Sequence, residues 1–245
     1  MATDAEAIEG GHGHAPESAH SALAHQFDNL EQQREAGTLG MWVFIAQEVM
    51  FFGGLFLAYL IYRMRYPEAF MAASNHLNWT IGTINTTVLI TSSLTMALAV
   101  WATQAGRAPK VQVALMLATV ALGLTFLTIK GFEYHEKYVD GLIPIAGWFN
   151  PSEEVLKHIP ASVTLGQYQM FFWLYFAMTG LHALHMIVGV LIITPIIYWA
   201  WRGRYSPEYH SPVENFGLYW HFVDIIWIFL FPLLYLLGAH FGKGH

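Results

Sequence analysis

Six side chains that could transfer protons or bind metals lie within long apolar stretches of this 245-residue sequence. They are three carboxylic acids and three histidines: Glu48, Glu133, Asp224, His182, His185 and His221. A carboxylate at mid-bilayer costs on the order of 3 kcal/mol on insertion scales, so protein must shelter such groups from lipid. Carboxylates and imidazoles serve in proton transfer and in transition-metal binding. The sequence therefore poses a choice between a proton or metal site and hydrogen bonds that hold helices together.

Glu48 lies near the middle of the first apolar stretch, residues 39–62. Helical spacing places Phe44, Phe51 and Phe52 on its side of the helix, so its surroundings are predicted to be apolar. We favour a structural role for Glu48, as a buried carboxylate that bonds to a neighbouring helix. A role in a proton or oxygen path is the alternative.

The three histidines and Asp224 lie in the fourth and fifth apolar stretches. Helical spacing places His182 and His185 on one face, and His221 and Asp224 on another. A metal site or haem ligation by paired histidines is one interpretation, but the Glu-x-x-His motif of di-iron bundles does not occur in these stretches. We expect no bound metal and instead a hydrogen-bonded polar network that joins the two stretches, with His221 bonded to Asp224.

Glu133 lies near the end of the third apolar stretch, in a run of charged residues from Lys130 to Lys137. The two lysines are three and four residues away from Glu133, so all three share one helical face and are predicted to pair. The simplest interpretation is a charge cluster that anchors the end of a helix, and Glu133 belongs to the expected intramembrane polar network.

Five apolar stretches must position these groups. We place them at residues 39–62, 79–103, 111–134, 168–201 and 216–239. Each is long enough to span a bilayer, which takes ~20 residues. The short link 104–110 predicts that the second and third spans are antiparallel neighbours, and the long link 135–167 predicts an ordered extramembrane loop. The predicted fold is an all-α integral membrane protein, a five-helix transmembrane bundle.

The overall composition is typical of a membrane protein. Hydrophobic residues make up 55% of the chain and charged residues only 11%, against about a quarter in soluble domains. The net charge of −6 and the lack of a basic stripe argue against nucleic-acid binding. Without cysteine the chain forms no disulfide and offers no thiolate ligand. Lysine and arginine are split evenly between the two sets of links, so they do not choose an orientation.

Residues 1–37 differ from the rest of the chain, because their Ala, Gly, Glu and His residues cannot form a buried core. We interpret them as a flexible His-rich segment with a short interfacial helix that begins near Phe27 and ends near Gly37. The membrane domain then covers residues 38–245. The histidines of this segment are His12, His14, His20 and His25. Their irregular spacing favours a flexible tail over a metal site.

Five motifs of this chain, taken in order, resemble subunit III of haem-copper cytochrome c oxidases. They are GTLGMWVFIAQEVMFFGGLFLAY, INTTVLITSS, LTIKGFEYHEK, TGLHALHMIVG and YWHFVDIIWIFLF. The resemblance covers nearly all of residues 27–238. Many members of this family have seven spans, whereas this chain lacks the first two and looks like the five-span bacterial form. The lipid-holding cleft that those two helices make in seven-span members is then absent here or is completed by another subunit.

The resemblance implies a cytoplasmic N-terminus, a periplasmic C-terminus and a place in the bacterial plasma membrane. It implies a non-catalytic subunit of a proton-pumping terminal oxidase of aerobic respiration, which stabilises subunit I and its proton uptake. No cofactor is then expected in this chain, since the haems and copper belong to subunits I and II. The implied partners are these two subunits, with subunit I as the main contact, and membrane lipids. Bound phospholipid is a candidate ligand, and a respiratory supercomplex is a candidate assembly.

The resemblance also matches individual residues of this chain to polar positions of the family. Glu48 matches the buried, carbodiimide-reactive glutamate of the family's corresponding span. The other matches fall on polar intramembrane positions of the family: Glu133, His182, His185, His221 and Asp224. Two alternatives within the family are subunit III of a quinol oxidase and a homologue associated with nitric oxide reductase. Alternatives of another class are a self-contained membrane haem protein and a proton transporter.

Overall fold

The computed structural model describes residues 26–145 and 148–241, and within these ranges it contains helices and no strands. The helices are α2 (Leu30–Arg65), α3 (Pro67–Ser74), α4 (Trp79–Gln104), α5 (Pro109–Val139), α6 (Glu153–Lys157), α7 (Leu165–Trp201) and α8 (Ser211–Phe241). Five helices of the described ranges, namely α2, α4, α5, α7 and α8, are long and apolar enough to cross a membrane. The prediction of an all-α, five-span membrane protein is confirmed.

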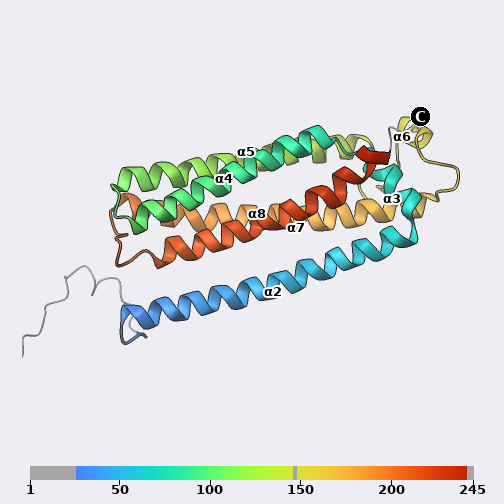
Figure 1. Ribbon diagram of the computed structural model, residues 1–245. Helices are drawn as coiled ribbons and strands as arrows, with labels where there is room; N and C mark the ends of the chain where they lie inside the picture. The colour runs from blue at the N-terminus through green and yellow to red at the C-terminus, as the bar shows by residue number, and fades with distance from the viewer. Residues whose placement is uncertain (1–25, 146–147, 242–245) are drawn as a thin grey trace, which may run out of the picture.

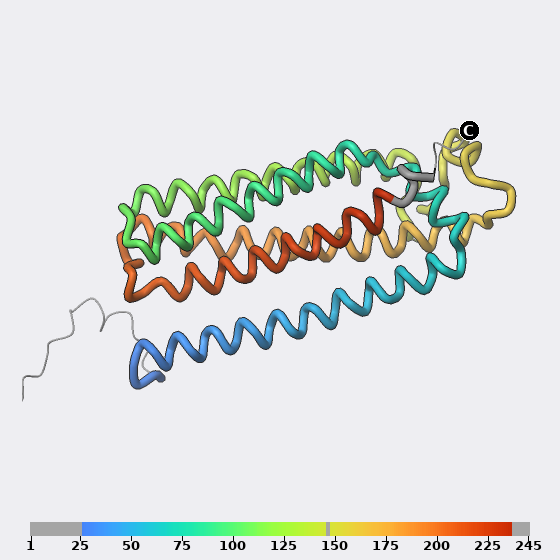
Figure 2. Tube along the Cα trace, viewed as in Figure 1, coloured from blue at the N-terminus to red at the C-terminus, as the bar shows by residue number. Residues whose placement is uncertain are grey.

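The long helices form one elongated bundle, with α2 along its side (Figure 1). The segment 66–78 and the described parts of the link 140–164 lie at one end of the bundle, and the links 105–108 and 202–210 lie at the other (Figure 2). α4 and α5 are antiparallel neighbours, as the short link between them predicted. Gly106, with a φ of 63°, supplies the left-handed residue of that turn.

The first helix differs from the prediction at its N-terminal end. α2 begins at Leu30, where the side chain of Asn29 accepts a hydrogen bond from the backbone N–H of Gln32, and it continues without a break past Gly37. The predicted end of a separate helix near Gly37 is therefore wrong. A glycine inside a helix costs only about 1 kcal/mol relative to alanine, too little to end a well-capped helix. The histidines of the N-terminal segment lie outside the described residues.

α7 is the longest helix, with 37 residues. A capping box fixes its start, because the Thr164 side chain accepts a bond from the Gln167 backbone while the Gln167 side chain bonds back to Thr164. At 1.5 Å per residue the helix measures about 55 Å, well beyond a hydrocarbon core of about 30 Å. Pro195 lies inside the helix without ending it. α7 therefore extends past the bilayer or crosses it with a tilt.

The centre of the bundle is built around the indole of Trp220 on α8, which is fully buried. Gly123 of α5 and Gly189 of α7 lie against this ring, since a Cβ atom added to either would stand 2.9 Å or 2.8 Å from it. The indole nitrogen donates a hydrogen bond of 3.0 Å to the hydroxyl of Ser92 on α4. The helices α4, α5 and α7 thus all pack against this one side chain of α8.

The long link after α5 folds back on itself beside the bundle end. α5 runs to Val139, five residues beyond the predicted end of its span, and Gly141 then adopts a left-handed φ of 70°. The Gly141 carbonyl accepts a hydrogen bond from the Asn150 N–H, and an added Cβ would stand only 2.0 Å from the Asn150 carbonyl oxygen. No side chain fits there, so this turn requires glycine.

His76, in the link between α3 and α4, lies where the two extramembrane segments of this end meet. Its ring is 5.9 Å from that of His158, and its carbonyl accepts a hydrogen bond of 2.9 Å from Lys137. Lys137 also forms ion pairs with Glu136 and Asp140, whereas the predicted partner was Glu133. Burial lowers the pKa of the His76 imidazole, and the charges of Lys137 and His158 lower it further, against the opposing effect of Asp140.

This lowered pKa predicts a stability loss in acid. Between the native pKa of His76 and the ordinary value of about 6.5, the unfolded chain binds more protons than the folded one. The free energy of unfolding should therefore fall as the pH drops below that value. We expect His76→Gln to reduce the pH dependence of the unfolding temperature measured in detergent from pH 8 to pH 5. An identical pH dependence in the variant would contradict this assignment.

Candidate functional site

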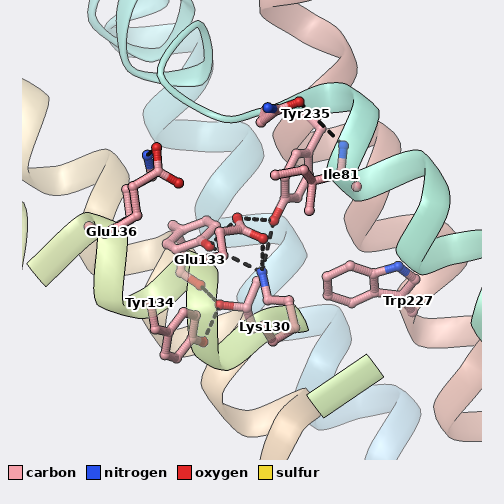
Figure 3. A network of polar contacts seen from close by, with 12 residues as sticks. Ile81, Lys130, Glu133, Tyr134, Glu136, Trp227 and Tyr235 are labelled. Carbon is pink, nitrogen blue, oxygen red and sulfur yellow. Dashed lines mark hydrogen bonds and ion pairs between the residues drawn. The ribbon is translucent and has the colours of Figure 1, made fainter. Parts of the chain in front are cut away.

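A buried ion pair lies in the last third of α5 and is seen from close by in Figure 3. Lys130 and Glu133 of α5 are only 3% and 5% exposed, and Lys130 Nζ is 3.1 Å from Glu133 Oε2. This pairing across three residues is the one that the spacing predicted. Because both charges are out of water, each needs further hydrogen bonds to offset the loss of hydration.

Two tyrosines supply those bonds. The hydroxyls of Tyr175 on α7 and Tyr235 on α8 both donate to Glu133 Oε1. Lys130 Nζ donates to the same two hydroxyls, at 3.1 Å and 2.8 Å. The ammonium also lies 5.1 to 5.5 Å from the ring centres of Tyr134, Tyr175, Trp227 and Tyr235. The pair thus joins three helices through an aromatic cage, which stabilises a desolvated cation.

Sequence reasoning missed both tyrosines. A tyrosine within an apolar span carries a hydroxyl that needs a partner, and this signal was available at Tyr175 and Tyr235. It does not name the partner, because the two residues lie on other helices than Glu133.

Glu48 lies against α7. The carboxyl is buried, and its Oε2 atom is 3.3 Å from Nε2 of His185, an ion-pair distance rather than a well-directed hydrogen bond. The Phe52 ring lies 5.4 Å from the imidazole, in agreement with the predicted apolar surroundings, while Phe51 is about half exposed. The structure thus brings together two of the predicted residues, on different helices.

The Glu48–His185 contact presents one particular ring nitrogen to the carboxyl. Nδ1 of His185 is 2.8 Å from the carbonyl oxygen of Leu181, and a carbonyl only accepts, so Nδ1 carries a hydrogen. Nε2 is then the ring nitrogen that faces Glu48. A carboxyl and an imidazole are both groups that serve in proton transfer, so the contact is chemically able to exchange a proton.

His221 is bonded to a different partner from the one predicted. Its Nδ1 atom is 2.6 Å from the hydroxyl of Ser93 on α4, and Asp224 makes no hydrogen bond to His221. The predicted bond between His221 and Asp224 is therefore wrong. Spacing along one helix places both residues on a common face, but a hydroxyl facing His221 from the next helix takes its ring nitrogen.

His182 has no polar partner among the described residues. It is fully buried, both ring nitrogens lack hydrogen bonds, and the ring lies between Phe126 and Trp227 at centroid distances of 5.3 Å and 5.0 Å. The predicted intramembrane residues thus occupy separate places in the bundle instead of one network. In the described part of the chain, no three His, Cys, Asp or Glu side chains gather as metal ligands would.

Comparisons with known proteins show to which family this chain belongs. A family model described as cytochrome c oxidase subunit III matches residues 153–239. The cytochrome c oxidase subunit 3 of Thermostichus vulcanus is 31% identical over 225 residues, which cover 90% of this chain and 96% of the relative. The chain belongs to the cytochrome c oxidase subunit III family. The resemblance noted in the motifs is confirmed.

Other relatives of this subunit III come from different oxidases. The probable quinol oxidase subunit 3 of Staphylococcus saprophyticus is 28% identical over 226 residues, or 90% of this chain and 100% of the relative. The haem-copper oxidase subunit I+III of Aeropyrum pernix is 31% identical over 205 residues, which are 80% of this chain but 22% of that protein. The five apolar helices in the described part of the chain, together with the family, make this subunit III a multi-pass membrane protein.

Proposed function

We propose that this subunit III is a non-catalytic part of a proton-pumping terminal cytochrome c oxidase, in which it stabilises subunit I and its proton uptake. The haems and copper then reside in subunits I and II, and subunit I is the main contact. The observation that carries this proposal is the separation of the three deep histidines. His182 lies between aromatic rings, His185 contacts Glu48, and His221 bonds to Ser93. Each serves a different helix contact, which is what a scaffold requires.

Purification of the complex from native membranes in mild detergent tests this proposal. Subunits I and II should co-purify with the chain, and the separated chain should show no Soret absorption. Oxidase stripped of the chain should begin turnover at the normal rate and then lose activity, with slower proton uptake. A stoichiometric Soret band in the separated chain would instead support a self-contained haem protein.

A second candidate is subunit III of a quinol oxidase, favoured by the full-length match to the quinol oxidase relative. The two candidates predict the same fold and the same partners, and they differ in the electron donor. Assays of the purified complex with reduced cytochrome c and with a quinol, under identical conditions, separate them.

We also propose that the chain lies in a bacterial plasma membrane with its N-terminus in the cytoplasm and its C-terminus in the periplasm. Residues 1–37 then form a cytoplasmic lead to the membrane domain. The absence of cysteine allows a direct test. Glu154→Cys and Glu208→Cys place a thiol at an exposed position at each end of the bundle. A membrane-impermeant maleimide should label Glu154→Cys in intact spheroplasts and leave Glu208→Cys unlabelled; the reverse pattern would overturn this orientation.

For Glu48 we propose a structural role through His185. Glu48→Gln keeps the size and hydrogen bonding of the side chain, so assembly and initial turnover should be unchanged. Glu48→Ala leaves His185 without its partner, and we expect a loss of about 1–3 kcal/mol in unfolding free energy. Thermal unfolding in detergent measures the difference, with Glu35→Ala on the exposed part of α2 as the control. Loss of turnover in Glu48→Gln alone would replace the structural role with a proton path.

A further inference from the structure

A cavity of about 250 Å³ lies between α4 and α8. Its polar wall is formed by Ser93, His221 and Asp224, and apolar side chains of both helices complete it. Three isoleucines line the cavity as well and are about half exposed on the outer surface of the bundle: Ile90, Ile225 and Ile228. The cavity therefore opens outward, between the isoleucines, and its polar wall lies inside. We call it the Asp224 socket.

Asp224 is the group in the socket whose hydrogen-bonding capacity is largely unused. The residue is 3% exposed, and neither of its carboxylate oxygens makes a hydrogen bond of good geometry. The Ser93 hydroxyl lies beside both His221 and Asp224, but its single hydrogen can serve only one carboxylate oxygen, and Trp227 Nε1 is bonded to the hydroxyl of Thr86. At least one oxygen of Asp224 is thus left without a donor, and a buried carboxyl with unmet hydrogen bonds is strongly unfavourable.

The Asp224 socket lies too deep in the membrane for water to supply the missing hydrogen bond. Asp224 is 13 residues from the first residue of α8 and 17 from the last, which places it about 20–25 Å from either helix end. At this depth the mouth of the socket faces hydrocarbon, and acyl chains offer no hydrogen bonds. A donor must come from a polar side chain on a neighbouring helix, where such groups bond across helix contacts.

We propose that the Asp224 socket receives a hydrogen-bond donor side chain, such as a hydroxyl, amide or imidazole, from a transmembrane helix of another oxidase subunit. The inference rests on the proposed function, because it requires a partner within the membrane. The donor bonds to Asp224, and the three isoleucines pack around the incoming helix. The α4–α8 face is then part of the subunit interface, with a polar contact at its centre.

Photocrosslinking in the intact complex tests the position of the partner. A photoreactive benzoylphenylalanine is placed at Ile228 on the rim, and for comparison at Leu191 on α7 and Phe132 on α5, both of which are highly exposed. The rim position should give one crosslinked subunit, mapped by mass spectrometry to a membrane helix with a polar side chain at the contact.

The other outcomes separate this proposal from the proposed function. Subunit crosslinks from the comparison positions alone, or lipid adducts alone at Ile228, overturn the socket while the chain remains a subunit of the complex. If no oxidase subunit co-purifies with the chain, both proposals fail.

Substitution of Asp224 tests the polar contact itself. Asp224→Leu fills the site without hydrogen bonds and should reduce the crosslink yield at Ile228 by about threefold to seventeenfold, which corresponds to the average and the maximum of measured interhelical hydrogen bonds. Asp224→Asn should retain most of the yield. The control is Thr128→Leu on α5, because that hydroxyl bonds only within its own helix, to the Leu124 carbonyl. An unchanged yield in Asp224→Leu would overturn the proposal even with the crosslink present.

Discussion

Lys130→Met should destabilise the bundle by about 3–5 kcal/mol, because it leaves the buried carboxylate of Glu133 without its counter-charge. The Tyr175 and Tyr235 hydroxyls would still donate to Glu133, but two hydroxyls do not neutralise a charge in this apolar setting. Thermal or denaturant unfolding of the purified chain in detergent should show a large loss. Lys110→Met, at the exposed start of α5, is the matched control and should have little effect.

The double variant Lys130→Met with Glu133→Gln separates charge from packing. Replacing both members of a buried pair is commonly far less harmful than removing one. We therefore expect the double variant to recover most of the stability that Lys130→Met loses. Equal stability of the single and double variants would show that Lys130 acts by filling space among the aromatic rings and not by balancing Glu133.

Trp220→Ala should also cost about 3–5 kcal/mol, the usual range for removing a large aromatic side chain from a core. The surrounding helices cannot close the space easily, since Gly123 and Gly189 have no side chains that could move into it. The Ser92 hydroxyl loses the indole donor as well. Unfolding in detergent measures the effect, and Trp199→Ala, with a partly exposed ring on the surface of α7, provides the comparison.

Substitution of the glycine that contacts Trp220 gives a second measure of how tightly this ring is packed. Gly189→Ala should cost about 1–3 kcal/mol, because its methyl group meets the Trp220 ring at 2.8 Å. Gly131→Ala should be neutral or mildly stabilising, since nothing lies within 4 Å of a Cβ at that position. If Gly189→Ala behaved like Gly131→Ala, the ring would not be held as tightly as the structure indicates.

The membrane helices were predictable from the sequence because the bilayer requires uninterrupted apolar runs of a known length. The second span, for example, was placed at 79–103 and is found at Trp79–Gln104. The continuation of α2 through Gly37 was not predictable, because a single glycine and a change in polarity are weak local signals. The cap at Asn29 and the length of the helix outweigh them.

Among the candidate sites, contacts within one helix were predictable from the sequence, and contacts between two helices were not. Lys130 and Glu133 share one helix, so their spacing was enough to predict the pair. The contact between Glu48 and His185 and the bond between His221 and Ser93 each join two helices. Residue spacing shows which face a side chain occupies but not which neighbour that face meets, and this depends on how the helices rotate and pack against one another. For this reason sequence reasoning predicted a bond from His221 to Asp224.

The inward position of Glu48 has a consequence for how firmly α2, which lies along the side of the bundle, is retained there. An ionisable side chain exposed to hydrocarbon at mid-bilayer costs on the order of 3 kcal/mol. Separation of α2 from α7 would bring Glu48 against acyl chains and take it away from His185, so this cost opposes the departure of the helix. Lateral exchange of α2 into the surrounding lipid is therefore disfavoured by more than the loss of its apolar packing.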